Sequence, residues 1–301
     1  MLKLAATPSQ LLALVPRRAW RWMLRGAVAA VVVPLLLLWV LAYIVGSDAR
    51  ILPPQLLAAK NLLIVTAHPD DECLFFSPSI LGILDRNKAV TGGLLVMSTG
   101  NNYGIGDVRK SELAGSCHAL GIDEKRCVVL DDPELPDSPT LWWNTDLIAG
   151  FVHDHVRKWE VDAIITFDEG GVSGHINHRA VSAAVRQYAS THAEAPVTFT
   201  LTTTALPRKY TLLGDLPYTA LPFLWRIIEA LTFPTNTARP EDGDRALAVN
   251  SWHRYGLTRA AFAQHPSQYT WDRHLYMIVS RYVWFNDLKR VPRVQAGQTR
   301  A

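Results

Sequence analysis

The stretch "NLLIVTAHPDDE", residues 61–72, joins a continuous apolar run to a polar cluster. A run of this length and composition is typical of a strand buried on both faces, as in a parallel sheet. The cluster that follows places one histidine and three carboxylates in the five positions 68–72. The sequence therefore predicts a buried strand whose carboxyl end carries a concentrated set of polar side chains.

Outward from this strand, apolar strand patterns alternate with helical patterns. Strands are predicted over 61–67, 89–99, 126–131, 161–167 and 197–203, and helices over 77–87, 106–121, about 143–159 and 176–190. Asp107 is a suitable N-cap for the second of these helices, and Gly121 is a suitable stop. Such alternation predicts a Rossmann-like α/β domain, with a mainly parallel sheet and helices on both faces.

Three polar clusters follow predicted strands, over 68–72, 98–109 and 168–178. Because the carboxyl ends of parallel strands share one edge of a sheet, we expect these clusters to meet there. "GNNYGIG", residues 100–106, lacks the spacing of a dinucleotide fingerprint and follows the second strand rather than the first.

The side chains at this edge predict a metal site. His68 and Asp71 can both reach one zinc-like ion, and Asp70 is then free to accept a proton from a water molecule. A third ligand is available from His175 or His178, and their spacing does not decide between them. The alternatives are a solvated acidic turn, surface histidines, or a calcium loop, but the spaced oxygens of a calcium loop are absent.

The composition limits the kind of partner. The chain has 301 residues and a formal charge of +3, with no long basic run in its body, so nucleic acid is not an expected partner. The three cysteines are odd in number and show no CxxC spacing, which argues against a disulfide framework and against a cysteine-built zinc site. Cys73 is expected to be a buried apolar residue rather than a nucleophile.

The N-terminal region predicts a membrane anchor. Residues 26–47 contain no charge and are long enough to span a bilayer, which favours a retained helix over a cleaved signal peptide. Residues 1–25 form a basic segment, and by the positive-inside rule they would stay in the cytoplasm while the rest is translocated. Residues 48–60 are a linker. The apolar segment 216–233 is expected to be a core helix, with a membrane-surface element as the alternative.

"AHPDDE" together with the downstream "GHINH" resembles the LmbE/PIG-L de-N-acetylase family. "STGNNYGIGDVRKSELAGSCHALGI", "FDEGGVSGHINH", "LPRKYTLLGDLP" and "HPSQYTWDRHLYMIVSRYVWFN" are similar to its eukaryotic membrane-bound branch. The resemblance covers roughly residues 61–285. It implies a catalytic domain over 61–290, followed by a tail over 291–301, that removes acetyl from N-acetylglucosaminylphosphatidylinositol, the second step of glycosylphosphatidylinositol (GPI) anchor synthesis. It also implies an endoplasmic reticulum membrane protein whose catalytic domain faces the cytosol.

The resemblance also implies roles for the site residues. His68, Asp71 and His178 would bind zinc or another divalent metal. Asp70 would be the general base, and His175 would polarise or protonate the tetrahedral intermediate.

Five further residues are expected near the site. Arg109 is the candidate partner of the substrate phosphate, the alternative being a surface arginine paired with Glu112. Asn101 and Asn102 are candidates for sugar hydroxyls or for a turn. Glu72 is expected to support the loop or a ligand histidine, and His265 either reaches the site or is structural.

Two other functions remain open. One is de-N-acetylation of another N-acetylglucosamine conjugate. The other is non-catalytic carbohydrate binding by a membrane protein on the same scaffold.

Overall fold

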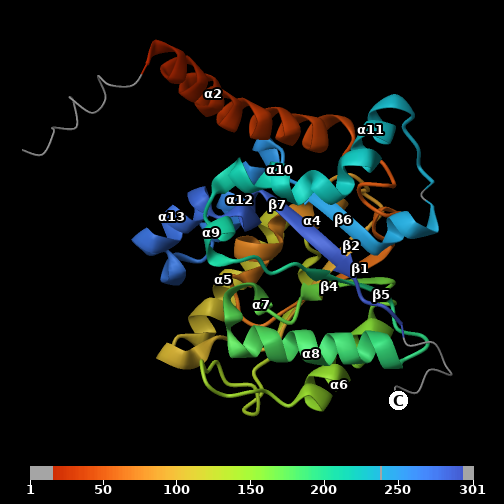
Figure 1. The fold of residues 1–301 in the computed structure, drawn as a ribbon. Coiled ribbons are helices and arrows are strands. Elements are labelled where there is room, and N and C mark those ends of the chain that lie inside the picture. The colour runs from red at the N-terminus through yellow and green to blue at the C-terminus, as the bar shows by residue number, and fades with distance from the viewer. Residues whose placement is uncertain (1–15, 238, 294–301) are drawn as a thin grey trace, which may run out of the picture.

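The computed structural model describes residues 16–237 and 239–293, built around a sheet of order β3-β2-β1-β4-β5-β7-β6 (Figure 1). The strands are β1 (Asn61–Thr66), β2 (Thr91–Val96), β3 (Cys127–Val129), β4 (Ala163–Phe167), β5 (Val197–Leu201), β6 (Arg245–Val249) and β7 (Phe285–Arg290). The first five are parallel, and β7 runs antiparallel to both β5 and β6. The predicted mainly parallel α/β sheet is confirmed, although β6 and β7 were not predicted.

Helices cover both faces of this sheet. They are α3 (Pro54–Leu57), α4 (Ser77–Leu84), α5 (Gly106–Leu120), α6 (Thr145–Lys158), α7 (Gly171–Gly174), α8 (Ile176–Thr191), α9 (Leu206–Lys209), α10 (Leu216–Ala220), α11 (Leu224–Thr232), α12 (Trp252–Phe262) and α13 (Trp271–Val279). The strand order reverses at β1, so right-handed crossovers place α4 and α5 on one face and α6 and α8 on the other (Figure 1).

The helix predicted over 106–121 begins one residue earlier than its expected cap. Ile105 occupies the N-cap position of α5, and Asp107 lies in the first turn without capping it, so that prediction was wrong. The Gly106 N–H donates instead to Asn101 Oδ1 at 2.8 Å. Gly121 ends the helix with a φ of 74°, as predicted, because a left-handed residue there satisfies the last carbonyls.

The cysteines differ from the prediction. Cys117 near the end of α5 and Cys127 at the start of β3 form a disulfide, although the odd cysteine count argued against such bonds. The crossover between strands brings the two together, and sequence spacing does not reveal this. Cys73 is free and buried, as predicted, and burial raises the pKa of its thiol well above the usual value.

The N-terminal helix is longer than the predicted anchor. It consists of α2 (Arg17–Trp39) and a π-helical turn, η1 (Val40–Ile44), and by length and composition it can cross a membrane. Its last part packs on the domain through Pro34, Leu38 and Leu41, against α10 and the short 3₁₀ helix η5 (Leu212–Asp215). Most of the predicted basic segment and of the tail lies outside the described residues.

Candidate active site

The candidate site lies at the carboxyl ends of β1 and β4. These two strands are neighbours in the sheet, and the chain leaves them in opposite directions. This is the switch point where open α/β sheets form their ligand crevices. The clusters after the two strands therefore meet, as the sequence predicted.

Asp71 closes the loop after β1. One of its carboxylate oxygens, Oδ2, accepts the backbone N–H of Ala67 at 3.0 Å and of His68 at 2.8 Å. The other, Oδ1, lies 3.3 Å from His178 Nε2. Burial opposes ionisation of Asp71, but the nearby His178 outweighs it, and the pKa of Asp71 is lowered. This loop thus presents a buried carboxylate between two histidines.

Asp70 occupies a strained backbone position, with a φ of 111° in a region that L-residues rarely adopt. Its N–H donates to Glu72 Oε2 at 3.0 Å, which holds this conformation. Its carboxylate lies 3.5 Å from Arg109 and 4.0 Å from Arg273. Burial raises the pKa of Asp70 to about 6, against the opposing effect of the two arginines. The strained backbone therefore holds the Asp70 carboxyl group beside the two arginines, where it can exchange a proton near neutral pH.

The loop after β4 orients the two histidines differently. His178 Nδ1 donates to the Gly171 carbonyl at 2.9 Å, so in the neutral ring Nε2, 3.3 Å from Asp71 Oδ1, carries the lone pair. Burial opposes protonation of this ring, but Asp71 outweighs it and raises the pKa of His178. His175 caps α8, and its Nδ1 accepts the Asn177 N–H at 3.3 Å, so in the neutral ring Nε2 carries the proton. His178 thus has the tautomer of a metal ligand, and His175 that of a donor.

His68, in the loop after β1, completes a set of ligand atoms for a divalent metal. His68 Nε2 lies 3.2 Å from Asn177 Oδ1 and 3.3 Å from Asp137 Oδ1, both acceptors, so it donates to them. Nδ1 is then left with a free lone pair, 4.0 Å from Asp71 Oδ2. Imidazole nitrogens of His68, His175 and His178 also lie within 4.8 Å of one another. Two free imidazole nitrogens around a buried carboxylate fit the ligand chemistry of zinc.

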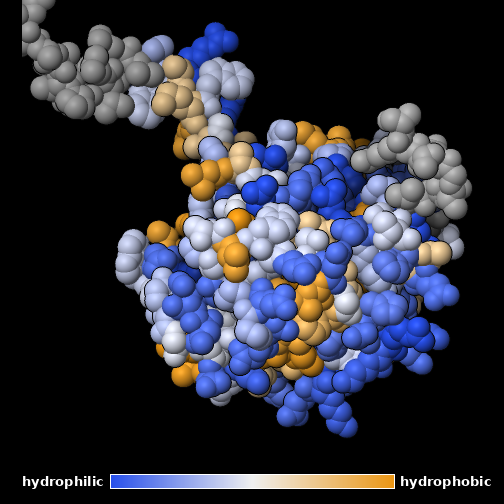
Figure 2. Space-filling model, turned by 90° about the horizontal axis from the view of Figure 1, so that it is seen from below, coloured by the Kyte–Doolittle hydropathy of each residue, from blue (hydrophilic) through white to orange (hydrophobic). Residues whose placement is uncertain are grey.

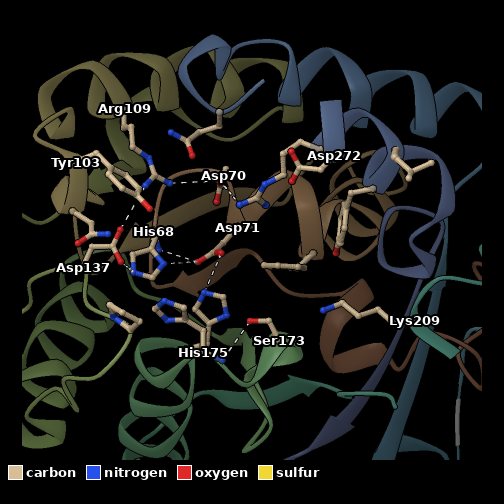
Figure 3. A pocket seen from close by; sticks show the side chains of 18 of the residues that line it. His68, Asp70, Asp71, Tyr103, Arg109, Asp137, Ser173, His175, Lys209 and Asp272 are labelled. Carbon is tan, nitrogen blue, oxygen red and sulfur yellow. Dashed lines mark hydrogen bonds and ion pairs between the residues drawn. The ribbon is translucent and has the colours of Figure 1, made fainter. Parts of the chain in front are cut away.

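These groups line a cavity of about 770 Å³, shown in Figure 3. The sticks show His68, Asp71 and His175 on its floor, with Arg109 and Asp137 on one side and Lys209 on the other (Figure 3). The lining further includes Asp70, Asn102, Tyr103, His178, Tyr210, Gln268, Asp272, Arg273, Leu275 and Tyr276. The cavity therefore combines the donor set with carboxylates, cations and aromatic rings.

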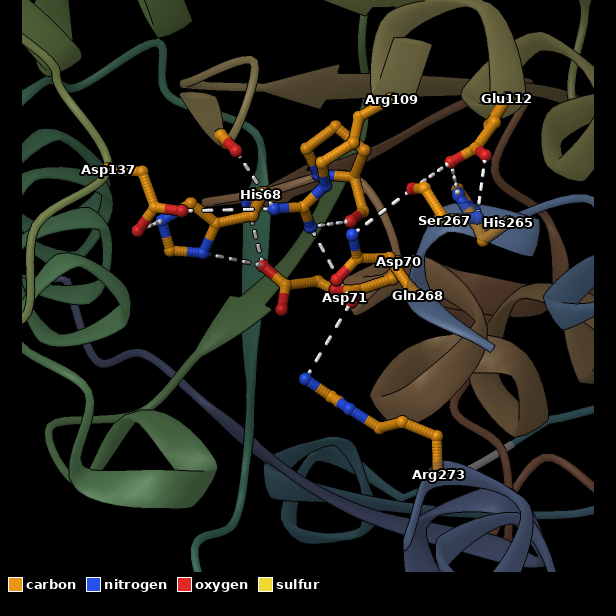
Figure 4. Close-up of polar contacts among 12 residues, drawn as sticks. His68, Asp70, Asp71, Arg109, Glu112, Asp137, His265, Ser267, Gln268 and Arg273 are labelled. Atoms are coloured by element: carbon orange, nitrogen blue, oxygen red, sulfur yellow. Dashed lines mark hydrogen bonds and ion pairs between the residues drawn. The ribbon is translucent and has the colours of Figure 1, made fainter. Parts of the chain in front are cut away.

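Arg109 lies at the site but is largely engaged by the protein. It is buried, and it donates to the carbonyls of Pro69 and of Gly100. It also lies near the carboxylates of Asp70 and Asp137, as Figure 4 shows. It makes no ion pair with Glu112, so the surface-arginine alternative is wrong. Its main contacts position the Asp70 loop.

The other predicted residues separate into two groups. Asn102 lines the cavity, whereas the Asn101 side chain caps α5 and takes the turn role. Glu72 lies behind Asp70, and its Oε1 pairs with His265 Nε2 at 2.8 Å. Both side chains are fully buried, and His265 does not line the cavity. Of the two alternatives for His265, the structure therefore gives the structural one, a supporting position behind Asp70.

The cavity residues that sequence reasoning missed include Asp137, Lys209, Arg273 and Tyr276. Lys209 and Arg273 lie in "LPRKY" and "WDRHLY", far along the chain from the motifs after β1 and β4. The signal that could have found them is a cationic residue within a segment shared with a known family. Their spacing alone carries no sign that they reach the site.

The comparisons with known proteins agree with this geometry. The family described as "PIG-L: GlcNAc-PI de-N-acetylase" matches residues 63–189. The N-acetylglucosaminyl-phosphatidylinositol de-N-acetylase of Bos taurus is 36% identical over 84% of this chain and 93% of its own length. The protein of the same name from Saccharomyces cerevisiae is 30% identical, over 74% of this chain and 79% of its own length.

One solved structure reports on the fold alone. The zinc-inhibited form of teicoplanin deacetylase Orf2 superposes with a TM-score of 0.50 at 10% identity, over 79% of this chain and 100% of the other. The sequence similarity to the curated relatives extends over most of the chain and includes both loops of the site. This chain is therefore a member of the PIG-L family of de-N-acetylases.

Proposed function

We propose that this chain removes acetyl from N-acetylglucosaminylphosphatidylinositol, the second step of GPI-anchor synthesis. The names of the cow and yeast relatives state this substrate for those proteins. The observation that carries the proposal is the cavity, where Asp70 and His175 flank the donor set of His68, Asp71 and His178. Two cationic side chains that line the cavity, Lys209 and Arg273, suit a substrate that contains a phosphodiester.

We assign the metal as zinc, held by His68, Asp71 and His178. When bound, a zinc ion would polarise the acetamide carbonyl and make a water molecule more acidic. The family is generally metal-dependent, and mixed imidazole and carboxylate ligands suit zinc.

Asp70 and His175 then divide the proton transfers. As the water oxygen attacks the carbonyl carbon, the Asp70 carboxylate accepts a water proton. The Nε2–H of His175 donates to the carbonyl oxygen as negative charge develops there. The C–N bond breaks when the sugar nitrogen takes the proton from Asp70, which leaves acetic acid and the amine; the acid then ionises to acetate and its proton passes to the amine or to solvent. Arg109 holds the Asp70 loop, and burial keeps bulk water from competing.

Substrate recognition is assigned to residues that line the cavity. Arg109 was the predicted phosphate partner, but its N–H groups already contact two carbonyls and two carboxylates. Arg273 is partly exposed, and the buried Lys209 ammonium donates a hydrogen bond to the Val172 carbonyl at 3.3 Å and lies over the Tyr210 and Tyr282 rings. We therefore propose Lys209 and Arg273 for the phosphodiester and Asn102 for a sugar hydroxyl.

The proposed location is the endoplasmic reticulum membrane, with α2 as a single-pass anchor and the catalytic domain in the cytosol. The substrate's pathway supports this orientation, because its sugar donor and preceding step are cytosolic. The basic residues before the span and the disulfide between Cys117 and Cys127 favour the other side. The redox state of these cysteines therefore distinguishes the two orientations.

The test of function compares two substrates and one variant. Purified full-length protein loaded with zinc is expected to release acetate from the lipid substrate in preference to a soluble N-acetylglucosamine analogue. Asp70→Asn is expected to abolish turnover while the metal content stays near that of the unsubstituted protein. Equal rates on both substrates would reject the lipid, and substantial activity of Asp70→Asn would reject Asp70 as the base.

A further inference from the structure

Helix α11 turns its apolar side outward and its charged residues toward the domain, which is the opposite of a surface helix in a soluble protein. Its outward side carries Leu224, Trp225, Ile228 and Leu231, which are 42 to 66% exposed and recur at helical spacing. Leu221 before the helix and Phe233 after it extend this apolar stripe, at 59% and 78% exposed. Soluble monomers rarely expose so many large apolar side chains together.

The polar residues of α11 face the protein instead. Arg226 pairs with Asp242 at 3.2 Å and with Asp244 at 2.9 Å. Glu229 accepts from Arg239 at 2.6 Å and from Arg50 at 3.3 Å. The helix thus has charged residues available for a wet surface but keeps them against its own domain. The apolar residues therefore face outward even though α11 contains charged residues that could have faced solvent.

Helix α13 also exposes apolar residues, beside the cavity. Trp271, Leu275 and Ile278 are 79, 50 and 47% exposed and lie three or four residues apart, which places them on one side of the helix. Leu275 also lines the cavity, together with Tyr210, which is 43% exposed. The mouth of the cavity is therefore bordered by an apolar surface.

The apolar stripe of α11 lies next to the candidate membrane span. The end of α2 packs on α10, which leads through the short 3₁₀ helix η6 (Leu221–Phe223) into α11. Figure 1 shows α2, α10 and α11 on the same side of the molecule. The opposite side, seen in Figure 2, is mostly hydrophilic, with apolar residues confined to smaller areas.

We propose that the exposed stripes of α11 and α13 form a membrane-docking surface that inserts into the interface of a phospholipid bilayer beside α2. Apolar side chains with tryptophans suit this interface, where aromatic rings are enriched. Docking places the mouth of the cavity at the lipid surface, so a lipid-linked headgroup reaches it without leaving the bilayer. This inference needs no assumption about the substrate, and its test uses no turnover.

The test places an environment-sensitive dye at single positions of the full chain in phosphatidylcholine vesicles. Nitrobenzoxadiazole is attached to Ile228→Cys on α11 or to Ile278→Cys on α13. Gln187→Cys, at an exposed position of α8, is the matched control. The unsubstituted chain measures labelling of the native cysteines. Dyes at 228 and 278 are expected to emit at shorter wavelength and to be quenched by lipids spin-labelled near the headgroup, whereas the dye at 187 stays in water.

Other results would overturn the proposal. If quenching at 228 or 278 equals that at 187, α2 alone holds the domain and that stripe does not touch lipid. If the dye is shielded from water but not quenched by lipid, a protein surface, such as a second copy of this chain, covers the stripe. Because α2 anchors every variant in the same vesicles, the readout reports the local position rather than overall membrane binding.

Discussion

At the scale of single residues, Glu72 determines the geometry of the site without touching the cavity. Its two oxygens receive the Asp70 backbone N–H and the His265 ring, and both side chains of the Glu72–His265 pair are fully buried. Burial opposes protonation of His265, but Glu72 outweighs it, and the pKa of His265 is raised. A buried carboxylate is tolerated here because a cation and hydrogen bonds surround it.

Removing His265 is expected to leave the buried Glu72 carboxylate without its cationic partner. His265→Ala should lower the free energy of unfolding by about 3 to 5 kcal/mol, the range for breaking a buried pair. His253→Ala, at an exposed position of α12, is the control and should change it by less than about 0.5 kcal/mol. Thermal unfolding of the full chain in detergent measures both. Similar melting temperatures for the two variants would contradict the role given to His265.

Lys209 and Arg273, the two cations assigned to the phosphodiester, give a second prediction. Arg273→Gln and Lys209→Gln should each lower kcat/KM for the phospholipid substrate by about 10- to 100-fold, the value of one charge-assisted hydrogen bond. A substrate analogue without the phosphodiester should lose much less. Arg259→Gln, at an exposed position of α12, controls for the change of net charge. Equal losses on both substrates would show that these cations act on something other than the phosphate.

The residue types of the site could be predicted from the sequence, but their division of labour could not. The spacing of His175 and His178 fits either as a ligand. The choice depends on which ring nitrogen is engaged, by the Gly171 carbonyl in one case and by the Asn177 N–H in the other. Arg109 was placed at the site correctly, yet its hydrogen bonds to carbonyls 9 and 40 residues away depend on loop closure. Spacing in sequence does not contain such contacts.

At the scale of elements, local pattern predicted the five parallel strands because most of their residues are apolar or β-branched. It missed β7, whose sequence "FNDLKR" mixes apolar and charged residues. That strand pairs with β5 and β6, which come from distant parts of the chain, so pairing rather than propensity makes it a strand. The disulfide between Cys117 of α5 and Cys127 of β3 was missed for the same reason, since the two cysteines meet only when the crossover is formed.

The oxidation state of the Cys117–Cys127 pair, which joins α5 to β3, indicates which side of the membrane the domain occupies. In the proposed cytosolic orientation the two cysteines are kept as thiols, because the cytosol is reducing. Maleimide added to denatured protein from intact cells should then modify Cys117, Cys127 and Cys73 without a reductant. If only Cys73 reacts until a reductant is added, the pair is oxidised, and the domain faces the lumen. Cys73 is the internal control for labelling.

At the scale of the whole molecule, the segment after α2 ties the membrane side to the domain. Asp48 accepts two hydrogen bonds from the Arg50 side chain, both at 2.8 Å, and the Thr235 N–H at 3.0 Å. Arg50 in turn contacts Glu229 on α11. The predicted linker 48–60 is therefore not a free connection. Its charges fix the direction in which α2 leaves the domain and the orientation of α11, which composition alone does not reveal.

This cluster gives the stability of the molecule a predictable dependence on pH. Burial raises the pKa of Asp48, but the hydrogen bonds from Arg50 and Thr235 outweigh it and lower the pKa below 3.8. As the pH falls, Asp48 is therefore protonated in the unfolded chain before it is protonated in the folded one. The stabilisation by its charge is complete above pH 3.8 and is lost as the pH falls through the lower pKa of Asp48 in the folded protein.

Asp48→Asn should therefore lower the melting temperature at pH 7, by the equivalent of about 1.5 to 3 kcal/mol for hydrogen bonds to a charged group. The difference from the unsubstituted chain should stay constant down to about pH 4 and shrink below it, because protonation removes the same charge. Asp154→Asn, at an exposed position of α6, should show no such convergence. Scanning both variants in detergent at several pH values tests this. A gap between Asp48→Asn and the unsubstituted chain that stays constant at low pH would mean that the cluster acts through packing rather than charge.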